Sequence, residues 1–309
     1  MTRRSRGRAL DGILILDKPQ GTSSNRALQV VKHLLGAAKA GHTGSLDPLA
    51  TGVLPLCFGE ATKFSQFLLD ADKAYLSTFV LGIATDSGDA DGRVLESKDT
   101  SDLTESDVLA ALRGFEGEIE QVPSMYSAIK QDGQPLYKLA RQGLEVERKP
   151  RSVVIKQLHL RAFRAGSRAE IEIDLECSKG TYVRSLAEDL GRVLGCGAHV
   201  SALRRTKAGP FSLENSIPLA ALQALHGSSD AAAIDRLLLP ADTALGALPV
   251  VRLSESGGFY LRQGQPVMVP NAPRGGIVRV TLHSGEFLGI GEILDDGRVA
   301  PRRLIVTGR

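Results

Sequence analysis

Residues 169–195 read AEIEIDLECSKGTYVRSLAEDLGRVLG, and this stretch decides the fold class of the chain. It begins with strict alternation of apolar and acidic side chains, the pattern of a strand buried on one face. Beyond Ser178 the pattern changes, and leucines recur at helical spacing until Gly195. A half-buried strand therefore leads into an amphipathic helix, and Tyr182 and Arg184 lie at the junction of the two.

The sequence on both sides adds strands and helices in irregular order. We expect strands at residues 12–16 and 73–83, a helix from the serine and threonine cap at 22–24 to Gly36, and a short helix at 103–112 that follows Ser101 or Thr104. This order predicts an α+β fold with a mainly antiparallel mixed sheet rather than a doubly wound parallel sheet.

The C-terminal part of the chain has a different composition. Residues 220–247 are rich in alanine and leucine and are typical of helices or a linker. Beyond them, short strand-like runs are separated by glycine-containing turns, and these runs span 276–282, 287–293 and 304–306. We therefore expect a first domain at residues 1–247 and a small β-rich domain at residues 248–309.

The overall composition is that of a globular protein. Hydrophobic residues make up 42% and charged residues 24% of the 309 positions, which excludes a disordered chain. No apolar run approaches the roughly 18 residues of a membrane helix, and no signal-peptide core follows the basic start, so we expect a cytoplasmic protein without membrane contacts. Cys57, Cys177 and Cys196 are odd in number and lack the spacing of a zinc site, which predicts buried free cysteines.

Charge is distributed unevenly along the chain. Residues 84–107 hold eight acidic and two basic side chains, whereas residues 141–168 hold eight basic and two acidic ones. Arg204, Arg205 and Lys207 form a second basic cluster. Such clusters can steer a polyanion, and we expect Arg205 to meet phosphate; the alternative is a solvated charged face.

A glycine-rich stretch near the N-terminus carries an isolated carboxylate. Residues 41–54 read GHTGSLDPLATGVL, in which Asp47 precedes a proline and lies among Gly41, Gly44 and Gly52. These glycines permit backbone conformations and close approaches that a Cβ would block. By spacing alone, Asp47 fits either an Asx-turn or a loop that presents a carboxylate for chemistry, and the loop follows the predicted helix directly.

This stretch closely resembles the signature of the TruB family of tRNA pseudouridine synthases. Further motifs of the family are present at residues 16–24, around Tyr75, and at 123–130, 177–184 and 203–205. The departures are few: many relatives have proline at the position of Ser124 and threonine at that of Ser45. The resemblance covers nearly the whole chain, and it implies a pseudouridine synthase fold followed by a PUA-like RNA-binding domain.

The resemblance also implies roles for single residues. Asp47 corresponds to the catalytic aspartate, and Arg184 to the arginine that orients it; otherwise Arg184 fits a surface ion pair. The substrate-binding positions of the family correspond to His42, Tyr75, Tyr182 and Leu203, and a supporting basic residue corresponds to Lys18. From pattern alone, the two tyrosines and the leucine fit core positions, the histidine a structural site, and the lysine the surface.

The resemblance implies isomerisation of the T-loop uridine of tRNA to pseudouridine at position 55. The base is flipped out, the C1′–N1 bond is cut, and the base is rejoined through C5. Asp47 can attack C1′, add to C6, or act as a base, and an ordinary aspartate pKa near 3.9 keeps it ionised.

No metal, organic cofactor or obligate protein partner is implied by the resemblance, and the full phosphate-loop pattern is absent from the sequence. The alternatives to a tRNA pseudouridine synthase are an RNA-binding or RNA-folding protein without catalysis, and a synthase that acts on another RNA.

Overall fold

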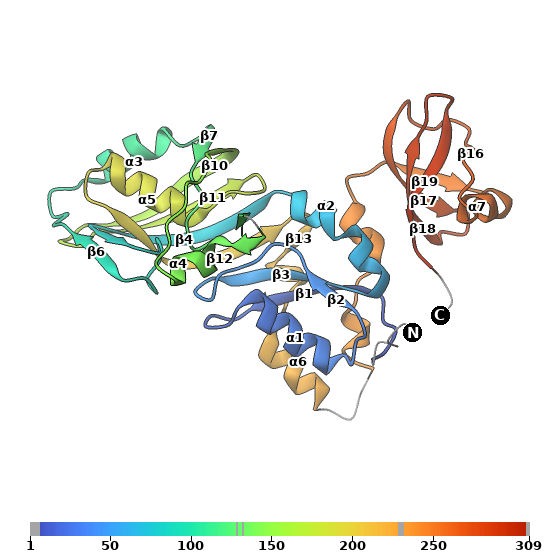
Figure 1. Ribbon diagram of the computed structural model, residues 1–309, viewed down its shortest axis with the longest axis horizontal. Helices are drawn as coiled ribbons and strands as arrows, with labels where there is room; N and C mark the ends of the chain where they lie inside the picture. Colours follow the sequence, from blue (N-terminus) through green and yellow to red (C-terminus); the bar gives the residue numbers. More distant parts are fainter. Residues whose placement is uncertain (1–6, 128, 132, 228–231, 307–309) are drawn as a thin grey trace.

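The computed structural model describes residues 7–127, 129–131, 133–227 and 232–306. One large sheet runs along the long axis of the molecule (Figure 1). Its strands are β1 (Gly12–Lys18), β2 (Ala40–His42), β3 (Thr51–Phe58), β4 (Lys73–Leu81), β7 (Gly117–Gln121), β10 (Arg151–Arg164), β11 (Glu170–Cys177), β12 (Ala198–Ala208), β13 (Phe211–Ser212) and β14 (Ile217–Pro218).

The strands follow the order β14-β1-β3-β12-β4-β11-β10-β7, with β2 paired to β3 and β13 to β12. Within the described part of the chain, the only parallel pairs of this sheet are β1–β14 and β3–β12. The prediction of an α+β fold with a mainly antiparallel mixed sheet is therefore confirmed.

The stretch 169–195 folds as its pattern predicts. Strand β11 buries its apolar face, with Ile171 and Ile173 fully buried. Helix α5 (Val183–Val193) follows, and the chain leaves it through Gly195 with a positive φ of 71°. The leucines of α5 pack into the same core cluster as the apolar face of β11.

The sequence pattern does not predict β10, although it is the longest strand of the sheet. Its pairing with β11 shifts register between Ile155 and Gln157 and again between Leu160 and Ala162. Each irregularity changes which face the following side chains occupy, so the period of two is lost from the sequence.

Helices accompany both halves of the sheet. The α-helices are α1 (Ser24–Leu34), α2 (Ser65–Asp70), α3 (Glu105–Arg113), α4 (Leu136–Arg141), α5, α6 (Leu219–His226) and α7 (Glu255–Arg262), and the 3-10 helices are η1 (Gly59–Phe64), η2 (Leu213–Asn215), η3 (Asp235–Leu237) and η4 (Ala241–Leu245). Ser23 caps α1 and Thr104 caps α3, as their positions predict. Helices α3 and α5 lie over one half of the sheet, and α1 and α6 lie against the other half (Figure 1).

Two hairpins lie outside the large sheet. Strand β5 (Ile83–Thr85) pairs with β6 (Val94–Ser97), and β8 (Lys130–Gln131) pairs with β9 (Gln134–Pro135).

Two apolar core clusters meet at the middle of the sheet. One contains the buried faces of α5 and β11, and the other contains those of α1, β1 and β3. Tyr75 of β4 and Leu203 of β12 are partly buried and pack against both clusters. These two residues therefore lie at the junction between the halves of the molecule.

A second sheet occupies the C-terminal part of the chain and is curled beside the first (Figure 1). Its strands are β15 (Val250–Leu253), β16 (Val267–Met268), β17 (Gly276–Leu282), β18 (Phe287–Ile293) and β19 (Arg298–Leu304), in the order β15-β17-β18-β19-β16. The predicted runs 276–282 and 287–293 are correct, but the run 304–306 is wrong because the last strand ends where that run begins. The division at residue 247 stays a prediction.

The three cysteines are buried and free, as predicted. Burial raises the pKa of Cys57 to about 12 and that of Cys177 to about 11, because the thiolate loses its hydration. Among the helices of the described residues, none has the length and apolar character required to cross a membrane.

Candidate active site

The Asp47 loop is held by hydrogen bonds to α1 and by packing in both core clusters. It joins β2 to β3, so the chain enters it from a short strand and not directly from the predicted helix. Ser24 of α1 accepts a hydrogen bond from Leu46 N–H at 2.7 Å and donates one to Leu46 O at 3.0 Å. Leu46 packs in one core cluster and Leu49 in the other. The residues on both sides of Asp47 are therefore fixed by the core.

Two glycines of the loop are required by the backbone. Gly44 has a φ of +76° and Gly52 a φ of +101°, conformations that other residues rarely adopt. A Cβ on Gly52 would lie 2.2 Å from the carbonyl oxygen of Arg205, because β3 and β12 run side by side there. Gly41 has neither a positive φ nor a neighbouring atom within 4 Å of the Cβ position, so the structure shows no such requirement for it.

Asp47 forms an ion pair with Arg184 at the start of α5. The distance from Asp47 Oδ2 to Arg184 Nε is 3.0 Å, and the aspartate side chain is 42% exposed while the arginine side chain is 6% exposed. A buried guanidinium therefore meets a carboxylate that a ligand can still reach.

Arg184 is fixed by two other segments. Its Nη1 donates to Ser87 O at 2.9 Å and its Nη2 to Tyr126 O at 3.1 Å. The carboxylate of Asp89 lies 3.6 Å from Nη1 and is itself 9% exposed. In the sequence, Asp89 is one of eight acidic residues at 84–107, and no local pattern distinguishes it from the others.

The pKa of Asp47 is raised above its ordinary value, because desolvation disfavours the charged carboxylate. The Arg184 guanidinium opposes this rise, whereas the carboxylate of Asp89 adds to it. The expectation of an ordinary pKa is therefore corrected: burial raises the pKa of this carboxylate, and Arg184 is the charge that opposes the rise most.

A pocket of about 320 Å³ opens beside Asp47. Five of the predicted site residues line it, namely Asp47, Tyr75, Tyr182, Arg184 and Leu203. His42 and Lys18 are not among its lining residues. The structure therefore gathers five of the seven predicted site residues around one pocket, and His42 and Lys18 are not part of its lining.

The two tyrosines reach the pocket from different elements. Tyr75 lies on β4 opposite Arg205 of β12, and burial raises the pKa of its hydroxyl. Tyr182 immediately precedes α5, and burial raises the pKa of its hydroxyl as well. Both phenols therefore stay neutral at physiological pH. Tyr75 is at once a core residue and a pocket residue.

Lysine and arginine side chains lie beneath the pocket. Lys18 is fully buried, and its ammonium donates to Pro19 O at 2.9 Å and to Thr22 O at 2.7 Å. Burial lowers the pKa of Lys18 to about 8, and that of Lys73 in the pocket wall also to about 8. The surface alternative for Lys18 is therefore wrong.

Arg205 does not meet solvent. It is 1% exposed, its Nε donates to Val53 O at 2.7 Å, and its Nη2 donates to Gly44 O at 2.9 Å. The expectation that it contacts phosphate is wrong, because a buried guanidinium that holds the Asp47 loop cannot reach an RNA backbone. Its neighbour Arg204 pairs with Asp17 at 2.7 Å.

His42 lies on β2, and its Nδ1 atom is buried without a hydrogen-bond partner among the described residues. Burial, with a smaller contribution from Arg205, lowers the pKa of the imidazole, so the ring is neutral at physiological pH. Within the part of the chain that the structure describes, no group of three or more His, Cys, Asp or Glu residues is arranged to hold a metal ion.

Part of the basic run at residues 141–168 is compensated across strands. Arg161 pairs with Asp174 at 3.1 Å and Arg164 with Glu172 at 2.6 Å, so acids of β11 face bases of β10. The structure supports the solvated charged face for these arginines rather than a free polyanion-binding patch.

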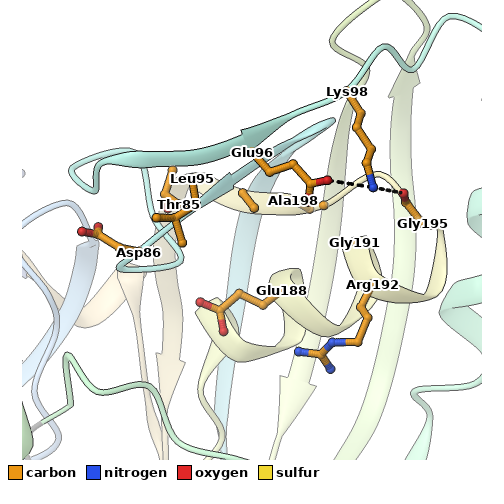
Figure 2. Close-up of a pocket in the computed structure, with 12 residues that line it drawn as sticks. Thr85, Asp86, Leu95, Glu96, Lys98, Glu188, Gly191, Arg192, Gly195 and Ala198 are labelled. Atoms are coloured by element: carbon orange, nitrogen blue, oxygen red, sulfur yellow. Dashed lines mark hydrogen bonds and ion pairs between the residues drawn. The ribbon is translucent and has the colours of Figure 1, made fainter. Parts of the chain in front are cut away.

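A second cavity, of about 430 Å³, lies between α5 and the β5–β6 hairpin (Figure 2). Glu188 is among its lining residues, one helical turn beyond Arg184. Lys98 Nζ lies 2.9 Å from Glu96 and 3.0 Å from Gly195 O. None of the predicted site residues lines this cavity.

Three sequence models of one protein family match the chain. The sequence model of the TruB family pseudouridylate synthase N-terminal domain matches residues 32–183, that of the tRNA pseudouridylate synthase B C-terminal domain matches 184–246, and that of the pseudouridine synthase II TruB C-terminal region matches 249–305. The tRNA pseudouridine synthase B of Ectopseudomonas mendocina is 58% identical over 301 residues, which cover 97% of each chain.

Solved structures share the fold. An H/ACA RNP bound to a substrate RNA containing 2′-deoxyuridine includes a chain that aligns with a TM-score of 0.71 at 24% identity, covering 99% of this chain and 92% of that one. A Cbf5-Nop10-Gar1 complex aligns with a TM-score of 0.68 at 26% identity, covering 96% of this chain and 84% of that one. From the family matches, the close relatives and the fold together, the chain belongs to the TruB family of pseudouridylate synthases.

Proposed function

We propose that this protein converts a uridine of tRNA to pseudouridine at position 55, in the loop of the T arm, with Asp47 as the catalytic residue. The observation that carries the proposal is the half-exposed carboxylate of Asp47, 3.0 Å from a buried guanidinium, in the wall of a 320 Å³ pocket. The names of the relatives supply tRNA as the substrate. The choice of the T-arm loop rests on the motif around Asp47.

The reaction is an isomerisation, so its atoms balance within the substrate. The C1′–N1 bond breaks, a C1′–C5 bond forms, the C5 proton leaves to solvent, and N1 takes up a proton. The ionised carboxylate of Asp47 attacks C1′, adds to C6, or removes a proton from the sugar. Each of the three roles needs an ionised and oriented carboxylate, and Arg184 supplies both conditions.

The pocket fits one flipped base. Its volume is at the small end of the range of about 300–1,000 Å³ for ligand pockets, which suits a single nucleotide. Unstacking costs a few kcal/mol, and stacking on an aromatic ring returns about 1–3 kcal/mol per base. Tyr75 and Tyr182 are placed to provide that ring surface, and Leu203 provides an apolar wall.

The remaining predicted residues act from outside the pocket. Lys18 supports the Asp47 loop from below, where its positive charge favours the ionised aspartate. His42 contacts the RNA loop with a neutral imidazole, whose Nδ1 is buried.

The test is tritium release from C5-labelled uridine in unmodified tRNA transcripts. We expect release by the wild type without added cofactor and none by Asp47→Ala, with tRNA binding by the variant largely intact. A transcript with cytidine at the T-loop target should release nothing from the loop. Normal turnover by Asp47→Ala would exclude its catalytic role, and release from transcripts that lack the T-loop uridine would indicate another RNA site.

A further inference from the structure

Gln121, the last residue of β7, holds the backbone of the pocket residue Tyr182. Its side chain is buried, with 1% of the residue exposed. Its Oε1 accepts a hydrogen bond from Tyr182 N–H at 3.0 Å, and its Nε2 donates one to Tyr182 O at 3.2 Å. The buried side-chain amide of Gln121 therefore forms hydrogen bonds with both backbone groups of Tyr182.

This contact lies where α5 begins. Tyr182 has an extended backbone, with φ −105° and ψ 109°, and no side chain caps the helix from this position. Its carbonyl also accepts the first hydrogen bond of the helix, from Leu186 N–H at 3.1 Å. Gln121 therefore determines the backbone geometry of the residue from which α5 and its Arg184 start.

The segment that follows Gln121 is attached to the same turn of α5. Ser185 Oγ donates to Val122 O at 3.1 Å, and Arg184 Nη2 donates to Tyr126 O at 3.1 Å. Gln121 begins this set of contacts, and Arg184, the partner of Asp47, belongs to it. Gln121 itself is not among the residues that line the pocket.

We propose that Gln121 is a positioning residue for the reaction. Through the backbone of Tyr182, it orients the Tyr182 ring toward the flipped base and fixes the first turn of α5, which carries Arg184. This inference rests on the proposed function.

The first test compares Gln121→Met with a matched control. Thr100 is 2% exposed, accepts from Ala169 N–H at 2.7 Å and donates to Gly166 O at 2.8 Å, so it makes the same kind of paired contact away from the pocket. We expect Gln121→Met to lower the single-turnover rate at saturating tRNA by roughly 10- to 100-fold, with the Kd for tRNA within about twofold of wild type. Thr100→Val should lose stability but keep the rate.

Gln121→Glu adds a pH signature. A buried carboxyl favours its neutral form, which accepts from Tyr182 N–H and donates to Tyr182 O as the amide does. Its ionised form cannot donate. The rate of this variant relative to wild type should therefore be near one at acid pH and should fall as pH rises. A ratio that is constant with pH would contradict the paired contact, and this variant also serves if Gln121→Met does not fold.

A double-mutant cycle with Tyr182→Ala separates a positioning role from general stability. Tyr182→Ala keeps the backbone groups that Gln121 binds and removes only the ring, so if Gln121 acts through the ring, the rate loss from Gln121→Met should shrink to less than about threefold in this background. Multiplicative losses would assign its action to the first turn of α5 instead, whereas a single-turnover rate of Gln121→Met within about threefold of an active wild type would overturn the role of Gln121 alone. A wild type that releases no tritium from tRNA would instead overturn the proposed function, and the role of Gln121 with it.

Discussion

The chemistry of the site depends on one buried arginine that faces two carboxylates. Arg184 presents Nε to Asp47 at 3.0 Å and Nη1 to Asp89 at 3.6 Å, and its terminal nitrogens also bind two backbone carbonyls. The fork geometry of a guanidinium makes this possible, whereas an ammonium offers no such fixed set of donors. The Arg184 guanidinium therefore both orients the Asp47 carboxylate and opposes the rise of its pKa.

The substitution Arg184→Gln should move the acid limb of the pH–rate profile. Without the guanidinium, the pKa of Asp47 rises further, because desolvation and Asp89 both raise it. In the proposed mechanism the ionised carboxylate is the active form, so the rate is lost as pH falls through the pKa of Asp47. The acid limb of the pH–rate profile should therefore move to higher pH by about 1–3 units.

The matched control is Arg192→Gln, on the same helix, where the side chain is 74% exposed and paired with Asp189. It should leave the profile unchanged. An acid limb at the wild-type pH in Arg184→Gln would show that Arg184 does not control the ionisation of Asp47.

The lowered pKa of Lys18 predicts a pH-dependent free energy of unfolding. The folded-state pKa is about 8, below the ordinary value of 10.5, so the unfolded chain binds more protons between these limits. The wild type should therefore gain stability relative to Lys18→Met as pH rises from 8 to 10.5, by up to about 3 kcal/mol.

Urea unfolding at several pH values measures the difference in unfolding free energy between wild type and Lys18→Met. Lys207→Met is the control, because the side chain of Lys207 is 50% exposed. A gap between wild type and Lys18→Met that does not change with pH would contradict the lowered pKa.

At the scale of elements, helix α1 positions the Asp47 loop. Two adjacent serines have different partners: Ser23 accepts from Arg26 N–H and caps the helix, whereas Ser24 binds both backbone groups of Leu46. The hydroxyl group of Ser24 thus links the start of the helix to Leu46, the residue that precedes Asp47.

Ser24→Ala should lower the single-turnover rate at saturating tRNA by about tenfold or more. The change leaves two buried backbone groups unpaired, at a cost of about 1–3 kcal/mol, and loosens the residue that precedes Asp47. Ser23→Ala should cost about 1 kcal/mol of stability through the lost cap and keep the rate. Equal rates for the two variants would argue against a role of α1 in placing the loop.

At the scale of the whole molecule, the C-terminal sheet is docked on the large one. The rings of Phe64 and Phe287 lie 5.4 Å apart, and Ile290 is buried in the same cluster as Phe64. Lys63 Nζ donates to Leu304 O at 2.7 Å, and Arg303 Nη1 donates to Lys63 O at 3.1 Å. The contact therefore combines apolar burial with hydrogen bonds between η1 and the C-terminal sheet.

Phe287→Ala should make the C-terminal sheet unfold separately from the large sheet. It removes the ring that packs on η1, at a cost of about 1–3 kcal/mol for a partly buried aromatic. Calorimetry should show one transition for the wild type and two for the variant, while the single-turnover rate at saturating tRNA stays near wild type. A single transition in the variant would indicate that the remaining contacts are sufficient to couple the sheets.

Features that depend on local pattern are determined by the sequence alone. The alternation in β11 predicts its buried face, because side chains on a strand have a period of two. Ser23 and Thr104 predict helix starts because a cap bonds to backbone groups only a few residues away. The glycines and proline around Asp47 predict a loop, and the family resemblance singles out its carboxylate.

Features that depend on the partner of a side chain are decided only by the tertiary structure. Arg205 looks like a phosphate-binding residue in the sequence and is buried under the Asp47 loop. Asp89, Gln121 and Ser24 have no local signal for their roles, because each acts on a residue more than 20 positions away. A local sequence pattern carries no information about such long-range contacts, so the residues that hold the Asp47 carboxylate are identified only in the folded chain.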